Sequence, residues 1–416
     1  MSGPFGSTLK GDAYFSSGDI AFIRVQNIKG GFDINDNDLV YISNKDNEKI
    51  KSSSLQEGDL ILSKVGNSIG YFAKVSSDLG KCNISENNIG IKLSSYSDIE
   101  KSFILTYLNA KYANKLVLRR KSGNAQPKIN VDDLCRIPIL IFPKLSENIH
   151  NLIQLHEAYL NQSILSYKQA EDILNKELGI TNIENTKNYS VKSFSESFGE
   201  SNRLDAEYYQ DKYTQLFDII KNGKQLKELV TITKSIEPGS DEYKDEGIPF
   251  LRVSNLTKFG LTDSNVFLDR KKYENLLKPR KDTILFSKDG SIGIAYKAES
   301  DLDCITSGAL LHLSVKKTTI LPDYLALVLN SKIVQLQAER DSGGSIINHW
   351  RLPEIEMVLI PMLDYDIQNQ ISQKVQESFK LRKDSKNLIN VAIRAVELAI
   401  EKNEEYASQW LIENSN

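Results

Sequence analysis

The hexapeptide Phe-Ile-Arg-Val-Gln-Asn at residues 22–27 recurs as Phe-Leu-Arg-Val-Ser-Asn at residues 250–255, an offset of 228 positions (250 − 22). A glycine stands shortly before each copy, at Gly18 and at Gly247. Internal repetition of this kind decides the architecture, because each copy is expected to form the same supersecondary unit. The pair therefore predicts one structural unit that the chain contains twice.

Five further pairs of short blocks extend the repeat on the C-terminal side. They are residues 59–70 with 282–293, 82–85 with 304–307, 108–111 with 329–332, 122–123 with 342–343, and 134–143 with 352–361. Each block alone is a weak signal. All of them keep their order and nearly the same spacing, and coincidence does not supply that.

Each copy predicts a mixed set of strands and helices. Residues 21–26, 60–63, 248–254 and 283–287 are typical of short strands, whereas residues 101–118 and 321–338 have helical composition. The glycine-bearing stretches 66–70 and 290–293 indicate tight turns between paired strands. The expected fold class is α+β, with two mixed α/β heads in a tandem pseudo-repeat.

A long helical segment follows each head. In the first, Ile153, Leu160, Tyr167 and Leu174 fall seven apart, with Ile149 and Ala170 beside them. In the second, a comparable apolar stripe contains Ile389, Ala392, Ile393, Val396, Ala399 and Ile400. Such stripes predict helices roughly 50 Å long that separate and follow the heads and pair as an antiparallel coiled coil.

Composition limits the other classes of function. The chain has 416 residues with 52 basic and 55 acidic side chains, a formal net charge of −3, which argues mildly against nucleic-acid binding. No apolar run reaches the roughly 20 residues that a bilayer requires, and the N-terminus does not resemble a secretory signal. We therefore expect no membrane partner and a cytoplasmic location. Three widely spaced cysteines, Cys82, Cys135 and Cys304, favour reduced packing residues.

The motifs together resemble the specificity subunit of type I restriction-modification systems. The resemblance rests on the opening at residues 3–10, the repeated Phe-x-Arg-Val-x-Asn, the Gly-Asp-x-Ile-Leu-Ser-Lys segment at 58–64, and Arg-Leu-Asp-Ala-Glu-Tyr-Tyr at 203–209. It implies two target-recognition domains. The expected boundaries are a first target-recognition domain at 1–143, a spacer helix at 144–180, a linker at 181–202, a second target-recognition domain at 203–361, a second spacer helix at 362–406 and a tail at 407–416.

The resemblance also implies partners and an absence of catalysis. The expected partners are double-stranded DNA, adenine-N6 methyltransferase (M) subunits and restriction-translocase (R) subunits. No cofactor is expected in this chain, because S-adenosylmethionine, ATP and Mg²⁺ would belong to the partner subunits. The two heads would read the two halves of a bipartite DNA site, and the paired helices would set the gap between them.

One feature departs from the family pattern. The second head has about 30 residues, 203–232, ahead of the segment at which the first head begins. The first head therefore lacks an opening helix and strand. Either the chain starts late, or another segment replaces the missing elements.

The usual catalytic motifs are missing from the sequence, in keeping with the resemblance. There is no Pro-Pro pair for an amino-methyltransferase loop and no Walker loop, and the four histidines have no zinc-ligand spacing. Glu242-Tyr-Lys244 has the Glu-x-Lys form of some nucleases but is better interpreted as a solvated turn. Two alternatives stay open: a recognition part split from a fused restriction-methylation enzyme, and a coiled-coil assembly protein with protein-binding heads.

Two loops at matching places in the repeat are the candidate DNA-binding regions, because DNA affinity needs cations and base reading needs amide, hydroxyl and guanidinium groups. The first-head candidates are Lys64, Arg119, Arg120, Lys121, Asn124, Gln126 and Lys128. The second-head candidates are Lys288, Arg340, Ser345, Asn348, His349 and Arg351. The alternative for each residue is an ordinary surface loop whose cations cap the preceding helix.

Overall fold

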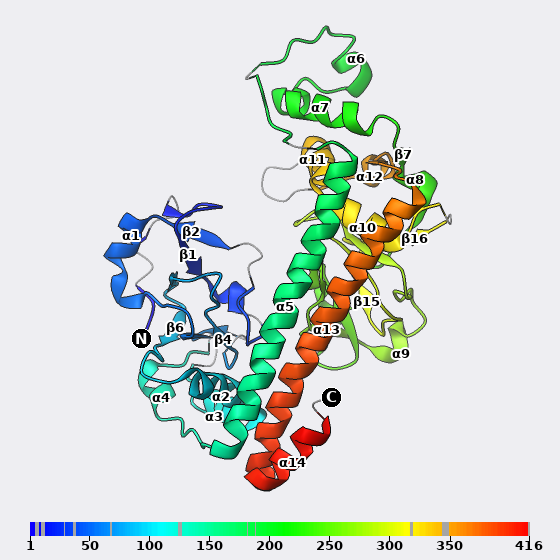
Figure 1. Cartoon of the computed structure of the whole chain (residues 1–416). Helices are drawn as coiled ribbons and strands as arrows, with labels where there is room; N and C mark the ends of the chain where they lie inside the picture. Colours follow the sequence, from blue (N-terminus) through cyan, green and yellow to red (C-terminus); the bar gives the residue numbers. More distant parts are fainter. Residues whose placement is uncertain are drawn as a thin grey trace. The chain divides into compact units, whose positions relative to one another are not determined.

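The computed structural model divides the chain into two compact units (Figure 1). Unit 1 contains residues 1–160 and 382–416, and unit 2 contains residues 161–381. The structure describes all residues except 5–7, 10–12, 29, 36–38, 67–68, 124–126, 181, 188, 317–318, 343–348 and 415–416.

Unit 1 has two three-stranded sheets in its described part. The first has the order β2-β1-β5 and the second the order β4-β3-β6. The strands are β1 (Ile20–Ile23), β2 (Val40–Ile42), β3 (Leu60–Ser63), β4 (Phe72–Lys74), β5 (Cys82–Ile84) and β6 (Asn88–Ile91). The helices that accompany them are α1 (Asn44–Lys49), α2 (Asp98–Asn109), α3 (Lys111–Arg119) and α4 (Val131–Cys135), with 3-10 turns η2 (Val25–Ile28) and η3 (Lys51–Ser53).

Unit 2 repeats this plan with additions. Its main sheets have the orders β12-β9-β15 and β14-β13-β16-β8, and two small pairs are β17-β7 and β10-β11. The strands are β7 (Lys224–Gln225), β8 (Val230–Lys234), β9 (Ile248–Leu251), β10 (Leu256–Thr257), β11 (Gly260–Leu261), β12 (Phe267–Leu268), β13 (Ile284–Ser287), β14 (Ala295–Lys297), β15 (Ile305–Thr306), β16 (Leu310–Val315) and β17 (Leu359–Ile360). The helices are α6 (Phe198–Ser201), α7 (Asp211–Ile220), α8 (Leu226–Leu229), α9 (Arg270–Tyr273), α10 (Pro322–Asn330), α11 (Lys332–Asp341) and α12 (Leu352–Glu356), with 3-10 turns η5 (Ala206–Tyr209), η6 (Ser240–Glu242) and η7 (Val253–Asn255).

The strand pairings confirm the repeat. β1 pairs antiparallel with β2 and parallel with β5, and β9 pairs antiparallel with β12 and parallel with β15. β3 lies between β4 and β6, as β13 lies between β14 and β16. The two registers also agree, since Ser63 faces Asn88 in unit 1 and Ser287 faces Leu310 in unit 2.

The repeated Arg-Val-x-Asn ends each first strand earlier than the sequence suggested. The expected strands over 21–26 and 248–254 stop at Ile23 and Leu251, and a 3-10 turn follows each. In these turns the Asn27 side-chain oxygen accepts from the Arg24 amide at 2.9 Å, and that of Asn255 accepts from the Arg252 amide at 3.0 Å. The motif is therefore a turn that an asparagine closes.

The expected helices over 101–118 and 321–338 are each two helices. They break at Ala110 and Ser331, which are extended, with ψ of 148° and 163°. The preceding asparagines explain the break, because each pairs with a strand. The Asn109 side chain exchanges two hydrogen bonds with the Phe72 backbone, and Asn330 does the same with Ala295.

The long helices are α5 (Pro143–Glu177) and α13 (Tyr365–Glu401), which pack side by side as an antiparallel coiled coil (Figure 1). In unit 1, the His156 ring of α5 contacts Ser385 of α13. In unit 2, the Ser163 hydroxyl lies 3.0 Å from that of Ser378 on the same seam. None of the helices that the structure describes is long and apolar enough to cross a membrane.

A further helix, α14 (Glu404–Asn414), occupies most of the region expected to be a tail. It buries Ala407 and Leu411 in the core of unit 1, which also contains Leu145 and Ile149 of α5. The two apolar residues lie four apart and so share one face of the helix. The C-terminal part of the chain thus contributes to the core of the first head.

Candidate DNA interface

The loop of the first head is attached to the turn that follows β3. Ser122 and Lys128 exchange two backbone hydrogen bonds of 2.8 Å, which close the loop at its base. The Ile129 amide then donates to the Lys64 carbonyl at 3.0 Å, and the Gly66 amide donates to the Pro127 carbonyl at 3.1 Å. The structure therefore brings Lys64 together with the predicted loop.

The loop of the second head is attached in the same way. The Trp350 amide donates to the Lys288 carbonyl at 2.9 Å, and Asp289 pairs with His349 as Val65 pairs with Lys128. Ile129 and Trp350 are each 1% exposed, so each fixes the end of its loop in the core. The repeated lysines thus have a structural role through their carbonyls.

The charges at the two loop bases differ. Burial lowers the pKa of Lys64, the Glu86 carboxylate opposes this shift, and the Lys128 ammonium adds to it. In unit 2, the His349 Nδ1 atom lies 2.8 Å from the Asp289 carboxylate, which also forms an ion pair with Lys288. Although burial favours protonation, these hydrogen bonds hold the pKa of Asp289 below its usual value. The base of the second loop is therefore closer to neutral charge than the base of the first loop.

Sequence reasoning missed Asp289, although the signal was present. The position between the repeated lysine and glycine holds Val65 in the first copy and Asp289 in the second. That single difference puts a carboxylate beside two of the predicted DNA-binding residues. The aligned repeat could have shown it, but the contact with His349 spans 60 residues and depends on the fold.

The remaining predicted residues fall into three groups. Arg119, Lys121 and Lys128 are exposed. Arg120, Arg340 and Arg351 have partners within the chain: Arg120 donates to the Arg136 carbonyl at 3.4 Å, Arg340 lies against aromatic rings, and Arg351 pairs with Glu354. The third group, Asn124, Gln126, Ser345 and Asn348, lies outside the described residues.

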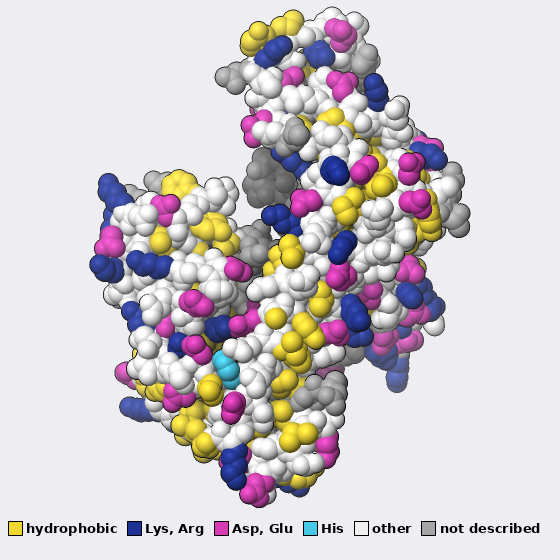
Figure 2. Space-filling model, in the orientation of Figure 1, with side chains coloured by type: hydrophobic (Ala, Val, Ile, Leu, Met, Phe, Trp, Pro, Cys, Tyr) yellow, Lys and Arg dark blue, Asp and Glu magenta, His cyan; other side chains and the backbone are white. Residues whose placement is uncertain are grey.

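Surface charge is mixed among the described residues. On the face drawn in Figure 2, Lys and Arg side chains alternate with Asp and Glu, and neither sign forms a broad field. Within the described part of the chain, no group of three or more His, Cys, Asp or Glu side chains is placed to hold a metal ion.

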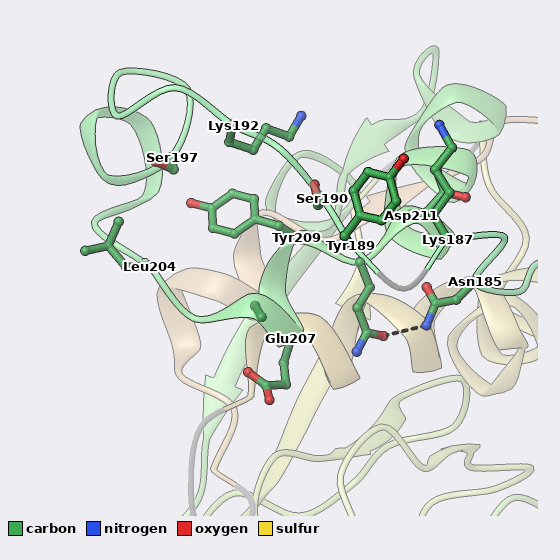
Figure 3. Close-up of a pocket in the computed structure, with 12 residues that line it drawn as sticks. Asn185, Lys187, Tyr189, Ser190, Lys192, Ser197, Leu204, Glu207, Tyr209 and Asp211 are labelled. Atoms are coloured by element: carbon green, nitrogen blue, oxygen red, sulfur yellow. Dashed lines mark hydrogen bonds between the residues drawn. The ribbon is translucent and has the colours of Figure 1, made fainter.

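A polar pocket of ≈500 Å³ separates the linker from the Arg203–Tyr209 segment (Figure 3). Its lining includes Lys187 and Lys192 from the linker, and Glu207 and Asp211 from the segment at the start of α7. The two cations and two carboxylates balance, so the pocket has no net charge that would select an anion. Asn185 bridges its two sides with a 3.1 Å hydrogen bond to Gln210.

The framework of loops and strands has a counterpart among known proteins. Residues 221–393, most of unit 2, match the family described as the type I restriction modification DNA specificity domain. This part of the chain is therefore similar to the specificity family. The matched span contains the second of the two loops.

The chain is also similar to individual proteins. The type I restriction enzyme EcoBI specificity subunit of Escherichia coli is 26% identical over 192 residues, which are 43% of this chain and 39% of that protein. The chain thus aligns with well under two thirds of that relative's length. Two solved structures are also similar: the S subunit from M. genitalium (TM-score 0.39, 13% identity, 95% of this chain and 92% of that one) and the HsdS subunit from Thermoanaerobacter tengcongensis (TM-score 0.30, 15% identity, 94% and 91%).

Proposed function

We propose that the chain is the DNA-recognition subunit of a type I restriction-modification assembly and reads a bipartite site, one half with each head. The observation that carries this proposal is the repeated loop framework. Each loop ends in a hydrogen bond to the carbonyl of a matched lysine, Lys64 or Lys288, whereas the residues between the matched flanks differ. A common scaffold with different loop interiors suits two heads that read different sequences.

The loops would combine phosphate contacts with base reading. In the first head, the exposed Arg119, Lys121 and Lys128 would meet phosphates together with Lys64, and Asn124 and Gln126 would read base edges. In the second head, the charge of Lys288 is partly neutralised by Asp289, which also lies against His349. Arg351, with a side chain 76% exposed, would be the main phosphate contact there, and Ser345 and Asn348 would read bases.

The chemistry would belong to partner subunits. Methyltransferase subunits would bind S-adenosylmethionine and methylate adenine, and restriction-translocase subunits would use ATP and Mg²⁺. The helix pair of α5 and α13 would separate the two half-sites. In such an assembly, this chain would supply only the recognition of DNA.

Methylome sequencing of cells that carry the chain with its methyltransferase partner tests the proposal. We expect methylated adenines in one bipartite motif with an unread gap of fixed length. Methylation by the purified chain alone, or a motif without two separated halves, would contradict it.

A loop exchange tests the independence of the heads. Replacing residues 342–349 with the loop of a subunit that reads another sequence should change one half of the motif and leave the other unchanged. The matched control replaces residues 122–128 and should change the other half. If either exchange altered both halves, the heads would not read DNA independently.

A further inference from the structure

The Arg203–Tyr209 segment contacts the end of α11, the helix that leads into the second recognition loop. The Arg203 Nη1 atom donates to the carbonyls of Arg340 at 3.3 Å and Asp341 at 3.4 Å. The last carbonyls of a helix have no partner within it, so an arginine there both satisfies them and suits the negative helix end. Arg203 therefore caps α11 from 137 residues away in the sequence.

A carboxylate holds the guanidinium of Arg203 in this orientation. Its Nε and Nη2 atoms donate to the two oxygens of Asp205 at 2.8 and 2.6 Å. This bidentate geometry uses the planar fork that arginine has and lysine lacks. The remaining nitrogen, Nη1, is left to point at the helix end.

Arg203 and Arg340 both contact the Tyr208 ring. The guanidinium carbons of the two arginines lie 4.6 and 4.1 Å from the centre of the Tyr208 ring. Arg340 also lies 4.5 Å from the Phe217 ring of α7, and it donates to the Tyr208 hydroxyl. Cation–π contacts of this kind stabilise by about 0.5–2 kcal/mol each, depending on exposure. Arg340 thus contacts the protein rather than facing outward.

Both flanks of the second loop are consequently attached. Arg340 and Asp341 are held by Arg203 and Tyr208, and Trp350 is held by the Lys288 carbonyl. We propose that Arg203, acting through Tyr208 and Arg340, is a positioning residue that sets the base preference of the second half-site. This inference rests on the proposed function in DNA recognition.

The first head has a different arrangement at the matching place. There the end of α3 carries Arg120, which donates to the Arg136 carbonyl at 3.4 Å. The Arg203–Tyr208–Arg340 contact therefore belongs to unit 2. Its loss should change one half-site and spare the other, which a general loss of folding would not do.

The test uses the full chain in complex with its methyltransferase partner and selects DNA from a duplex pool in which both half-sites are randomised. For Arg203→Ala we expect about a tenfold loss of preference at the second half-site, which corresponds to about 1.4 kcal/mol, and an unchanged first half-site. Tyr208→Ala should act like Arg203→Ala. Tyr208→Phe keeps the ring and should retain the preference.

A matched control is Arg280→Ala, which removes an arginine of unit 2 whose side chain is 79% exposed and paired with Asp301. It should leave both half-sites unchanged. Thermal unfolding of every variant reports on folding. If Arg203→Ala does not fold, Arg203→Lys gives the answer, because it keeps the charge and should still lose the preference.

The outcomes separate the two proposals. If the wild-type complex selects no bipartite site, the proposed function is wrong and the positioning role is wrong with it. If the wild type selects a bipartite site and a folded Arg203→Ala or Arg203→Lys keeps the same second half-site, only the positioning role is overturned. Equal loss at both half-sites would also overturn it.

Discussion

Asp341 carries a partly buried carboxyl at the residue where α11 ends. Burial, only partly offset by Arg340, raises its pKa to about 6 from 3.8. A carboxyl with a raised pKa opposes folding when ionised, so the fold should gain stability as pH falls from 7 through 6 toward 4. Asp341→Asn should raise the unfolding temperature at pH 7.5, with a gain in free energy of up to about 3 kcal/mol. Thermal unfolding across this pH range measures the gain in stability.

Asp303 provides the opposite control for that experiment. It is an exposed carboxyl whose pKa is lowered by hydrogen bonds from Arg270 and Lys278. Asp303→Asn should not raise the unfolding temperature at pH 7.5. A gain of similar size in both variants would mean that the effect comes from the net charge of the protein and not from burial of Asp341.

His156 is a second buried ionisable residue, on the α5–α13 seam of unit 1. Burial opposes its charge, but the hydrogen bond and charge of Asp33, 3.2 Å from Nε2, raise its pKa above 6.5. Its contribution to stability is therefore complete below pH 6.5 and lost as pH rises through the folded pKa. Asp33→Asn should lower that pKa and remove this dependence, as unfolding temperatures between pH 6 and 9 would show.

His312 is a buried histidine that serves as a control for His156. Burial lowers the pKa of His312 to about 4, so it stays neutral over the same range. His312→Gln should leave the slope of unfolding temperature against pH unchanged between pH 6 and 9. If the wild-type slope survived in Asp33→Asn, His156 would not be its source.

At the scale of the helices, the α5–α13 seam contains buried polar residues where the heptad pattern expects apolar ones. Ser163 and Ser378 are both fully buried, with hydroxyls 3.0 Å apart. Replacing one of them with alanine leaves the other hydroxyl without that partner, at a cost of about 1–2 kcal/mol. The double variant Ser163→Ala, Ser378→Ala should cost less than the sum of the single changes. A double-mutant cycle on urea unfolding measures the difference, and simple additivity would contradict the coupling.

The same helices show what sequence could predict. The apolar residues seven apart, from Ile153 to Leu174, identified the coiled-coil face because that period is local and strong. His156 and Ser163 fall on the same face but were not expected there. Their burial depends on partners on α13 more than 200 residues away, which no local pattern contains.

Long-range partners also explain the errors in the smaller elements. The helix breaks at Ala110 and Ser331 follow from asparagines that pair with strands about 35 residues earlier. Arg340 was predicted to contact DNA because a cation precedes a glycine-bearing loop. Its contact with Tyr208 spans 132 residues, so composition could not show that Arg340 also has a partner within the chain.

At the scale of the molecule, the two units complete their folds differently. Unit 2 contains α7, β7 and α8 ahead of its first main strands, and β17 pairs with β7. In unit 1, Ile141 matches Leu359 of β17 at the repeat offset of 218, yet it is 70% exposed. Unit 1 instead includes residues 382–416 from the far end of the chain. Among these residues, α14 packs into the core of unit 1 through Ala407 and Leu411.

The stability of the first head should therefore depend on α14. Leu411 is 4% exposed in the core of unit 1, so Leu411→Ala should cost about 2–5 kcal/mol, whereas Ile412→Ala, at a side chain 64% exposed, should cost little. Hydrogen exchange followed by mass spectrometry localises the effect. In Leu411→Ala, amides of α2 and α3 should exchange faster, and those of β13 and β16 should not, because they belong to unit 2. Equal acceleration in both units would show that the heads unfold together, and the separate-unit description would then fail.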